Sequence, residues 1–183
     1  VGRICRIKRL DLMINALALT PGLKLKVVGV SDEPDAMRYF KNEIQKHDLN
    51  SRVEFLGRVS DEVLIGLYAR ALGVFYAPFN EDYGYVTLEA MASGKPVITA
   101  SDSGGTLEFV RHGENGFVVE PTAESLAEAC NAIAADRDLA IRLGTAGRSY
   151  IESSGMLTTG WDAVVAGLTS PLEVSPSRCV GER

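Results

Sequence analysis

Strand-like and helix-like runs alternate along this chain, and that alternation restricts the fold more than any other feature. Residues 10–19 place apolar side chains on one helical face, and the β-rich run 25–30 follows them. Further strand-like runs at 53–57, 73–76 and 97–99 are separated by more helical patterns. Strands that alternate with helices form a parallel sheet, and right-handed crossovers cover both of its faces with helices. We therefore predict an α/β fold with a Rossmann-like, doubly wound parallel sheet.

Local signals mark where some of these helices begin. Ser60 and Thr122 are residue types that suit helix N-caps, because their hydroxyls accept hydrogen bonds from the first helical N–H groups. Val63 is expected on the apolar stripe of the helix that Ser60 begins.

The two ends of the chain differ from its middle. A last helix is expected around residues 161–168, and beyond it serine and proline recur without apolar periodicity. This composition predicts a disordered tail over residues 169–183, so residues 1–168 are assigned to one domain. The chain begins at Val1 rather than methionine, and we interpret it as an excerpt cut inside or just before its first strand.

Composition narrows the class of ligand. The chain has 183 residues, of which 46% are hydrophobic, so it can bury the core of one sizeable domain. Its net charge of −5 argues against nucleic-acid binding, which usually shows a basic surplus. Basic residues nevertheless crowd the first nine positions, where no acid appears. This cluster indicates either an anionic small-molecule ligand or a solvated basic edge. Its members are Arg3, Arg6, Lys8 and Arg9.

The cysteines and the apolar runs bear on location. Cys5, Cys130 and Cys179 are odd in number and widely spaced, which fits neither a disulfide framework nor a zinc site. A reducing compartment suits this pattern, and we expect a cytoplasmic protein. No apolar run reaches the ~18 residues that a membrane span needs. Membrane contact is therefore expected only through a part of the protein that this chain lacks.

Glu81 and Glu89 lie on either side of a predicted helix start. Gly84 falls at the turn before this helix. Ligands of doubly wound sheets bind at the carboxyl ends of the strands, where N–H groups at helix starts receive anions. Glutamates near helix starts are also common because the helix dipole favours them. The context favours two acids that bind the hydroxyl-rich ends of a nucleotide-sugar, with its phosphates at the helix start.

Arg3 and Lys8 have the spacing of a strand-end arginine and a lysine that converge on one anion. The departure of a nucleoside diphosphate builds negative charge, and fixed cations aimed at that charge lower the barrier. Arginine binds phosphate oxygens in bidentate fashion, whereas lysine acts as a point charge. The alternative is a helix-start arginine beside a solvent-exposed lysine, and the spacing alone does not separate the two.

Other titratable residues give no site. Neither His47 nor His112 has a carboxylate or cysteine partner at catalytic spacing. No Asp-x-Asp segment and no histidine cluster suggests a bound metal, so we expect neither a metal nor a cofactor.

Three motifs together resemble the C-terminal half of a retaining glycosyltransferase of the GT-B fold. The segment from Gly2 to Lys8 is similar to the Gly-Arg…Lys segment of that family. The run from Glu81 to Glu89 resembles the family's Glu-x₇-Glu signature, and residues 103–116 resemble the loop and turn that follow it. The match spans most of the chain. The family includes bacterial mannosyl- and glucosyltransferases and sucrose synthases.

The resemblance implies roles by position. Arg3 and Lys8 would hold the donor diphosphate and stabilise the leaving group. Glu81 would bind sugar hydroxyls near the reacting carbon, and Glu89 would bind the ribose hydroxyls. The other donor-binding positions that the resemblance implies are Val59, beside the nucleobase, and Gly84, Tyr85 and Val86, at the helix start.

Two departures from the family pattern leave the sugar preference open. Arg9 follows Lys8 where the family usually has glycine, and it can alter the turn there. Asp82 and Tyr83 replace the commoner Gly-Phe after the first glutamate.

We therefore predict the donor-binding domain of a nucleotide-sugar-dependent glycosyltransferase that uses a UDP- or GDP-sugar and no metal. By resemblance, the intact enzyme retains anomeric configuration, and its acceptor site belongs to an N-terminal domain absent from this chain. We expect the chain alone to bind nucleotide-sugar weakly and to transfer nothing. Two alternatives stay open: a GT-B relative such as a sugar-nucleotide epimerase or a phosphorylase, and a non-catalytic nucleotide-sugar-binding module.

Overall fold

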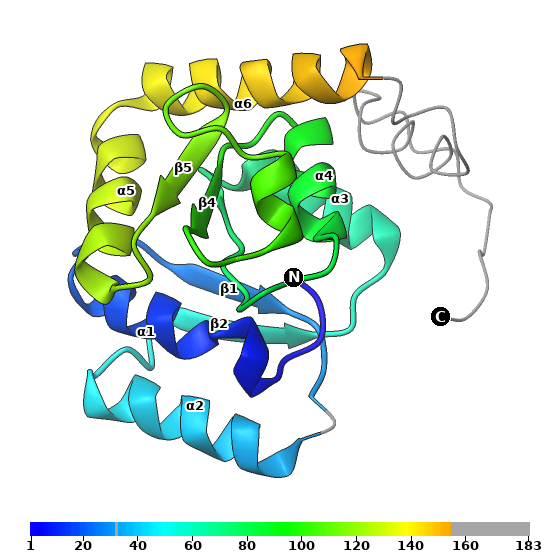
Figure 1. The fold of residues 1–183 in the computed structure, drawn as a ribbon. Coiled ribbons are helices and arrows are strands. Elements are labelled where there is room, and N and C mark those ends of the chain that lie inside the picture. Colours follow the sequence, from blue (N-terminus) through cyan, green and yellow to red (C-terminus); the bar gives the residue numbers. More distant parts are fainter. Residues whose placement is uncertain (32, 155–183) are drawn as a thin grey trace.

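The structure, a computed structural model, describes residues 1–31 and 33–154 (Figure 1). The helix expected at 161–168 and the tail expected at 169–183 lie outside the described residues. The elements in chain order are the 3₁₀ helix η1 (Arg6–Lys8), α1 (Leu10–Ala18), β1 (Leu25–Val28), α2 (Pro34–Lys46), β2 (Val53–Gly57), α3 (Asp61–Arg70), β3 (Val74–Phe75), α4 (Tyr85–Ala92), β4 (Val97–Ala100), the 3₁₀ helix η2 (Gly105–Glu108), β5 (Gly116–Val119), α5 (Ala123–Ala135) and α6 (Arg137–Ser153).

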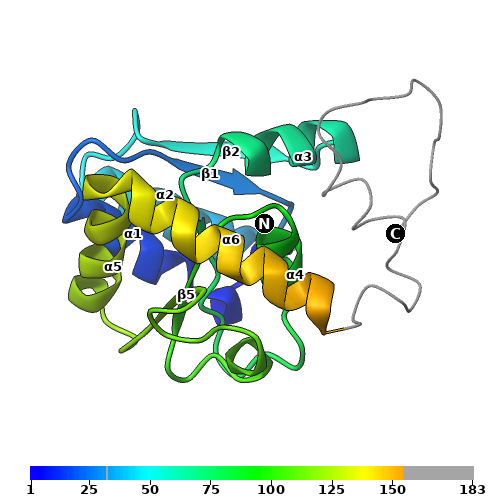
Figure 2. The same cartoon turned by 90° about the horizontal axis from the view of Figure 1, so that it is seen from above.

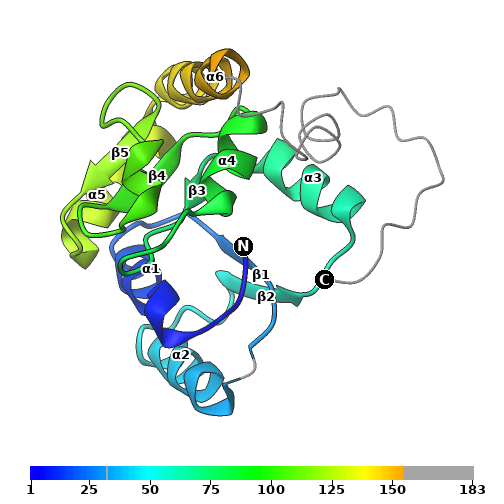
Figure 3. The same ribbon diagram turned by 45° about the vertical axis from the view of Figure 1, so that its right-hand side comes forward.

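The strands are paired in parallel, as the alternation of strands and helices predicted. They form two sheets, one of β1 and β2 and the other in the order β3-β4-β5. Helices cover both faces, so the predicted α/β, doubly wound architecture is confirmed (Figure 3). Among the described residues, β1 and β3 are not hydrogen-bonded to each other, which is why the parallel strands divide into two sheets.

The central strands of the second sheet divide their side chains between two cores. Alternate residues of a strand point to opposite faces. Val74 and Val97 pack on the face that α3, α4 and α6 cover. Phe75 and Ile98 pack on the opposite face, against α1 and α5. Figure 2 shows α6 extending from α5 at one end to α4 at the other, and α6 contacts both of these helices.

The first residues of the chain run beside the end of β1. The N–H of Gly2 donates to the carbonyl of Val28 (3.0 Å), and the N–H of Ile4 donates to that of Val30 (2.9 Å). These bonds progress in the direction of a parallel strand. A cavity of about 330 Å³ with mostly apolar walls lies between β1 and β3. That the chain begins in or just before a first strand stays a prediction.

Two of the predicted helix caps are confirmed. Ser60 accepts a hydrogen bond from the N–H of Val63 (3.4 Å), and Thr122 accepts one from the N–H of Ser125 (3.2 Å). The prediction that Val63 belongs to the apolar stripe of α3 is wrong, because its side chain is 47% exposed. Successive residues of a helix are rotated by roughly 100°, so Val63 lies at the edge of the apolar stripe that Leu64 and Tyr68 define. The core covers only the middle of that stripe.

No helix within residues 1–31 and 33–154 combines the length and the apolar character that crossing a bilayer requires.

Candidate functional site

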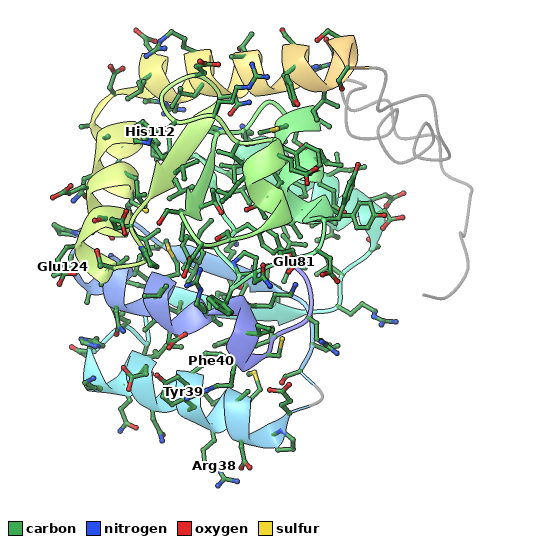
Figure 4. The ribbon with its side chains drawn as sticks, in the orientation of Figure 1. Arg38, Tyr39, Phe40, Glu81, His112 and Glu124 are labelled. Atoms are coloured by element: carbon green, nitrogen blue, oxygen red, sulfur yellow. The ribbon has the colours of Figure 1, made fainter. Side chains whose placement is uncertain are left out.

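Lys8 and Glu81 come from distant parts of the sequence and contact each other. The Lys8 ammonium donates a hydrogen bond to the Glu81 carboxylate and a second one, of 3.2 Å, to the hydroxyl of Tyr76. The side chains of both charged residues are largely buried. Figure 4 shows Glu81 beside the N-terminal segment and well away from His112 and Glu124. The structure therefore brings together two of the three residues predicted to be catalytic.

The surroundings of Lys8 keep its ammonium charged. Burial alone would lower the pKa of Lys8, but the hydrogen bonds to Glu81 and Tyr76 more than offset this effect, so the pKa lies above its usual value. Burial also raises the pKa of Tyr76, although its bond to Lys8 opposes the rise. The phenol thus stays neutral, and the site presents one fixed cation beside one carboxylate.

The glycine-rich loop that follows β4 holds the backbone of Glu81. The N–H of Glu81 donates to the carbonyl of Ser103 (3.2 Å), and the N–H of Gly105 donates to the carbonyl of Glu81 (2.6 Å). A Cβ built on Gly104 would lie 2.5 Å from the Glu81 carbonyl oxygen. A larger residue would force the two backbones apart, so glycine is needed for this close approach.

Glu89 lies on α4 and binds Tyr68 of α3. The Tyr68 hydroxyl donates to the Glu89 carboxylate at 2.9 Å, and Tyr68 is only 3% exposed. Burial raises the pKa of Glu89, while the bond from Tyr68 partly opposes this rise. Burial and the neighbouring carboxylate also raise the pKa of Tyr68, so it remains a donor. One carboxylate oxygen is thereby fixed by a neutral partner.

Replacing Tyr68 by phenylalanine is expected to destabilise the fold by about 1–3 kcal/mol, because the half-buried Glu89 carboxylate loses its hydrogen-bond donor. The pKa of Glu89 should rise further in the same variant. Urea denaturation and an NMR titration of the glutamate carboxyls measure the two effects. Tyr39→Phe is the matched control, since the Tyr39 hydroxyl also binds a carboxylate, that of Asp11 (3.2 Å), but outside this site. An unchanged Glu89 pKa in Tyr68→Phe would contradict the assignment.

The start of α4 lies between the two glutamates, as predicted. Gly84 precedes the helix with φ 80°, in the left-handed region, and Tyr85 and Val86 are the first helical residues. Tyr85 is 50% exposed, whereas Val86 is buried. A Cβ on Gly2 would lie 3.9 Å from Val86, so the N-terminal segment passes beside this helix start.

The roles predicted for two further site residues stay untested. Arg3 is exposed, and its predicted convergence with Lys8 on one anion stays a prediction. Val59 is half-buried after β2, and its place beside a nucleobase also stays a prediction. Arg9 does not abolish the turn after Lys8, because it adopts the left-handed conformation that glycine favours (φ 50°).

Sequence reasoning missed the tyrosines that hold the charged residues. The sequence pattern places Tyr68 on the apolar stripe of the helix that Ser60 begins and Tyr76 at the end of the strand-like run 73–76, and neither pattern indicates a hydrogen bond to a charged residue. A signal for their role exists, because a tyrosine hydroxyl in a buried position usually finds a partner. Asp102, which binds Arg9, was not singled out at all. Among the residues that the structure describes, no group of three His, Cys, Asp or Glu side chains could hold a metal ion.

Comparisons with solved structures define the class. The fold matches the structure of Anabaena HepE in complex with UDP, with a TM-score of 0.79 and 27% identity over 90% of this chain and 47% of that one. It also matches the C-terminal domain of a glycosyl transferase group 1 family protein (LpcC) from Francisella tularensis. That comparison gives a TM-score of 0.73 and 26% identity over 84% of this chain and 82% of that one. The described residues are thus a Rossmann-like domain of the GT-B glycosyltransferase class.

Sequence comparison identifies the family. The family model for glycosyl transferases group 1 matches residues 1–150, and the chain belongs to this family. It is 34% identical over 166 residues to the human alpha-1,3/1,6-mannosyltransferase ALG2, covering 83% of this chain and 40% of that protein. The chain therefore spans less than half the length of ALG2 and of HepE.

Proposed function

We propose that this chain is the donor-binding domain of a nucleotide-sugar-dependent glycosyltransferase. The observation that carries the proposal is the contact between Lys8 and Glu81, beside a helix start that Glu89 flanks on its other side. A cation, helix N–H groups and two carboxylates are suited to a ligand with a diphosphate between two hydroxyl-rich ends. HepE, which the chain resembles in fold, has been crystallised with UDP and with UDP-glucose.

The proposal assigns each residue one part of the donor. Arg3 and Lys8 hold the diphosphate, and their charges offset the charge that develops as it departs. Glu81 accepts hydrogen bonds from sugar hydroxyls. Glu89 binds the ribose hydroxyls, and Val59 lies beside the nucleobase. The backbone at Gly84, Tyr85 and Val86 contacts the phosphate and the sugar.

Two parts of the proposal concern the complete enzyme. Because two cations can replace a metal at the leaving group, we propose metal-independent transfer with retention of configuration. We also propose that the acceptor binds to a second, N-terminal domain, so that this chain alone transfers nothing. The LpcC domain, which this chain covers over most of its length, is described as C-terminal. The cytoplasmic location expected from the cysteine pattern belongs to the same proposal.

Thermal unfolding with UDP, GDP, ADP, UDP-glucose and GDP-mannose tests the binding step. At a ligand concentration a hundred times Kd, the expected gain in unfolding free energy is about 2.7 kcal/mol, and EDTA should leave it unchanged. ADP-ribose, which has the diphosphate but a different hydroxyl-rich end, serves as control. The proposal fails if no nucleotide or nucleotide-sugar stabilises the chain at millimolar concentration.

A further inference from the structure

Arg9 has a backbone conformation that arginine rarely adopts. It joins η1 to α1 with φ 50° and ψ 44°. In this left-handed region the Cβ crowds the following carbonyl, so that glycine, and less often asparagine or aspartate, is usual there. A residue in such a conformation persists only when its surroundings over-determine it.

The side chain of Arg9 supplies those surroundings through contacts with distant segments. Nε donates to the carbonyl of Ala77 (2.9 Å), and Nη2 donates to the carbonyl of Pro78 (2.8 Å). The guanidinium also binds both carboxylate oxygens of Asp102, at 2.8 and 2.7 Å. Bidentate, charge-assisted pairs of this kind fix geometry more strongly than neutral hydrogen bonds. We call these contacts the Arg9 clamp.

The segments that the Arg9 clamp joins are those that carry the site. The residues at 77–78 lead from β3 into the Glu81 loop. The N–H of Asn80 donates to the carbonyl of Asp102 (3.0 Å). The loop after β4, which carries Asp102, therefore supports the Glu81 loop directly. The N–H of Phe79 donates to the carbonyl of Ile7 (2.9 Å), next to Lys8.

We propose that Arg9 is a positioning residue whose clamp holds Lys8 and Glu81 in contact for donor binding. Lys8 immediately precedes Arg9, so fixing the guanidinium against residues 77–78 also fixes the backbone of Lys8 against the Glu81 loop. That the contact between Lys8 and Glu81 serves donor binding rests on the proposed function. That Arg9 holds these two residues in contact does not depend on it. The hydrogen bond from Arg9 lowers the pKa of Asp102, which keeps the carboxylate ionised for the clamp.

Arg9→Gly tests the clamp without disturbing the turn, because glycine adopts the left-handed conformation freely. The readout is the pKa of Lys8, followed through its Nζ and Cε signals by NMR. We expect this pKa to fall toward its usual value, since the contact with Glu81 loosens. Asp102→Asn should lower the pKa of Lys8 by a smaller amount. Arg9→Lys should lower it less than Arg9→Gly does, because lysine keeps the positive charge but lacks the planar guanidinium that binds both carboxylate oxygens.

Arg38→Ala is the matched control, since Arg38 pairs with Asp35 (3.4 Å) in an exposed ion pair outside the site. It should leave the pKa of Lys8 unchanged. Should Arg9→Gly fail to fold, Asp102→Asn replaces it in the test. This variant removes the charged partner of Arg9 but keeps the Arg9 side chain and its bonds to the carbonyls of Ala77 and Pro78, so it disturbs the fold less. An unchanged Lys8 pKa in folded Arg9→Gly, or in folded Asp102→Asn where it stands in, overturns the proposal.

Calorimetry with UDP-glucose, GDP-mannose and the free nucleotides then links the clamp to the donor. In Arg9→Gly we expect about tenfold weaker binding of the nucleotide-sugar that the parent chain prefers, since small misplacements at such sites are costly. Binding of the free nucleotide, which lacks the sugar that Glu81 would contact, should weaken less. If Arg9→Gly binds the nucleotide-sugar like the parent, the positioning role is wrong. If the parent binds none of these nucleotides and nucleotide-sugars, the proposed function fails instead, and the Lys8 titration still decides whether the Arg9 clamp holds Lys8 in place.

Discussion

Replacing Lys8 by methionine is expected to lower sugar transfer by the complete enzyme about 10²–10³-fold, with a larger effect on kcat than on KM. The reason is that Lys8 supplies one of the fixed charges that stabilise a departing diphosphate, and losing one such group typically costs this much. In this chain the Lys8 side chain is half-buried and Glu81 and Tyr76 hold its ammonium, so the position of the charge is set before the donor arrives. Steady-state kinetics of the variant measures the loss.

A double-mutant cycle with Glu81→Gln separates catalysis from simple ion pairing. If Lys8 only neutralised Glu81, the double variant would recover most of the activity that Lys8→Met loses, because no unpaired carboxylate would remain. We expect no such recovery, since each side chain has its own part of the donor to bind. Lys26→Met is the control for the loss of a lysine, because Lys26 pairs with Glu54 (3.1 Å) on the exposed surface. Recovery in the double variant would refute the role of Lys8.

The parts of the site that the sequence predicted depend on physics within a few residues. Gly84 before an apolar helix marks a left-handed turn, and the structure has φ 80° there. Ser60 and Thr122 mark helix starts because their hydroxyls bond three residues ahead. Strand and helix periodicity then places the carboxyl ends of the strands at one edge, where ligands of such sheets bind. None of these inferences needs a contact between distant segments.

The parts that the sequence did not predict depend on such contacts. The partners Arg9 and Asp102 are 93 positions apart, and no local pattern joins an arginine in a turn to an aspartate in a loop. Tyr68 fits an apolar stripe equally well whether or not its hydroxyl reaches Glu89. The prediction that Val63 is part of the apolar stripe is wrong for a related reason. Helix periodicity indicates which side of the helix faces the core but not how wide the buried face is. Pairwise recognition inside the site is therefore a property of the tertiary structure.

Replacing Gly105 by alanine is expected to disturb the site more than the fold. A Cβ on Gly105 would lie 2.3 Å from the carbonyl oxygen of Asp82 and 3.0 Å from the Cα of Tyr83, so the backbone between Glu81 and α4 must shift. Shifts of about 1 Å at such positions can cost 10²-fold in activity. The accompanying loss of stability should be about 1–3 kcal/mol, as for other overpacked sites. Because the backbone of Gly105 does not need a positive φ, the effect is steric rather than conformational.

Gly66→Ala, in α3, is the matched control for this substitution. The atoms nearest to its Cβ would all belong to the flexible end of Arg70, the first at 3.2 Å, and alanine in a helix interior is favoured over glycine by roughly 0.5–1 kcal/mol. Urea denaturation and nucleotide-sugar binding should therefore show no loss in Gly66→Ala but a loss of both quantities in Gly105→Ala. If Gly105→Ala loses stability and still binds nucleotide-sugar with the parent's affinity, the Glu81 loop is not part of the donor site. In that case the close approach of the Gly105 and Asp82 backbones serves only to pack the loop that follows β4 against the Glu81 loop.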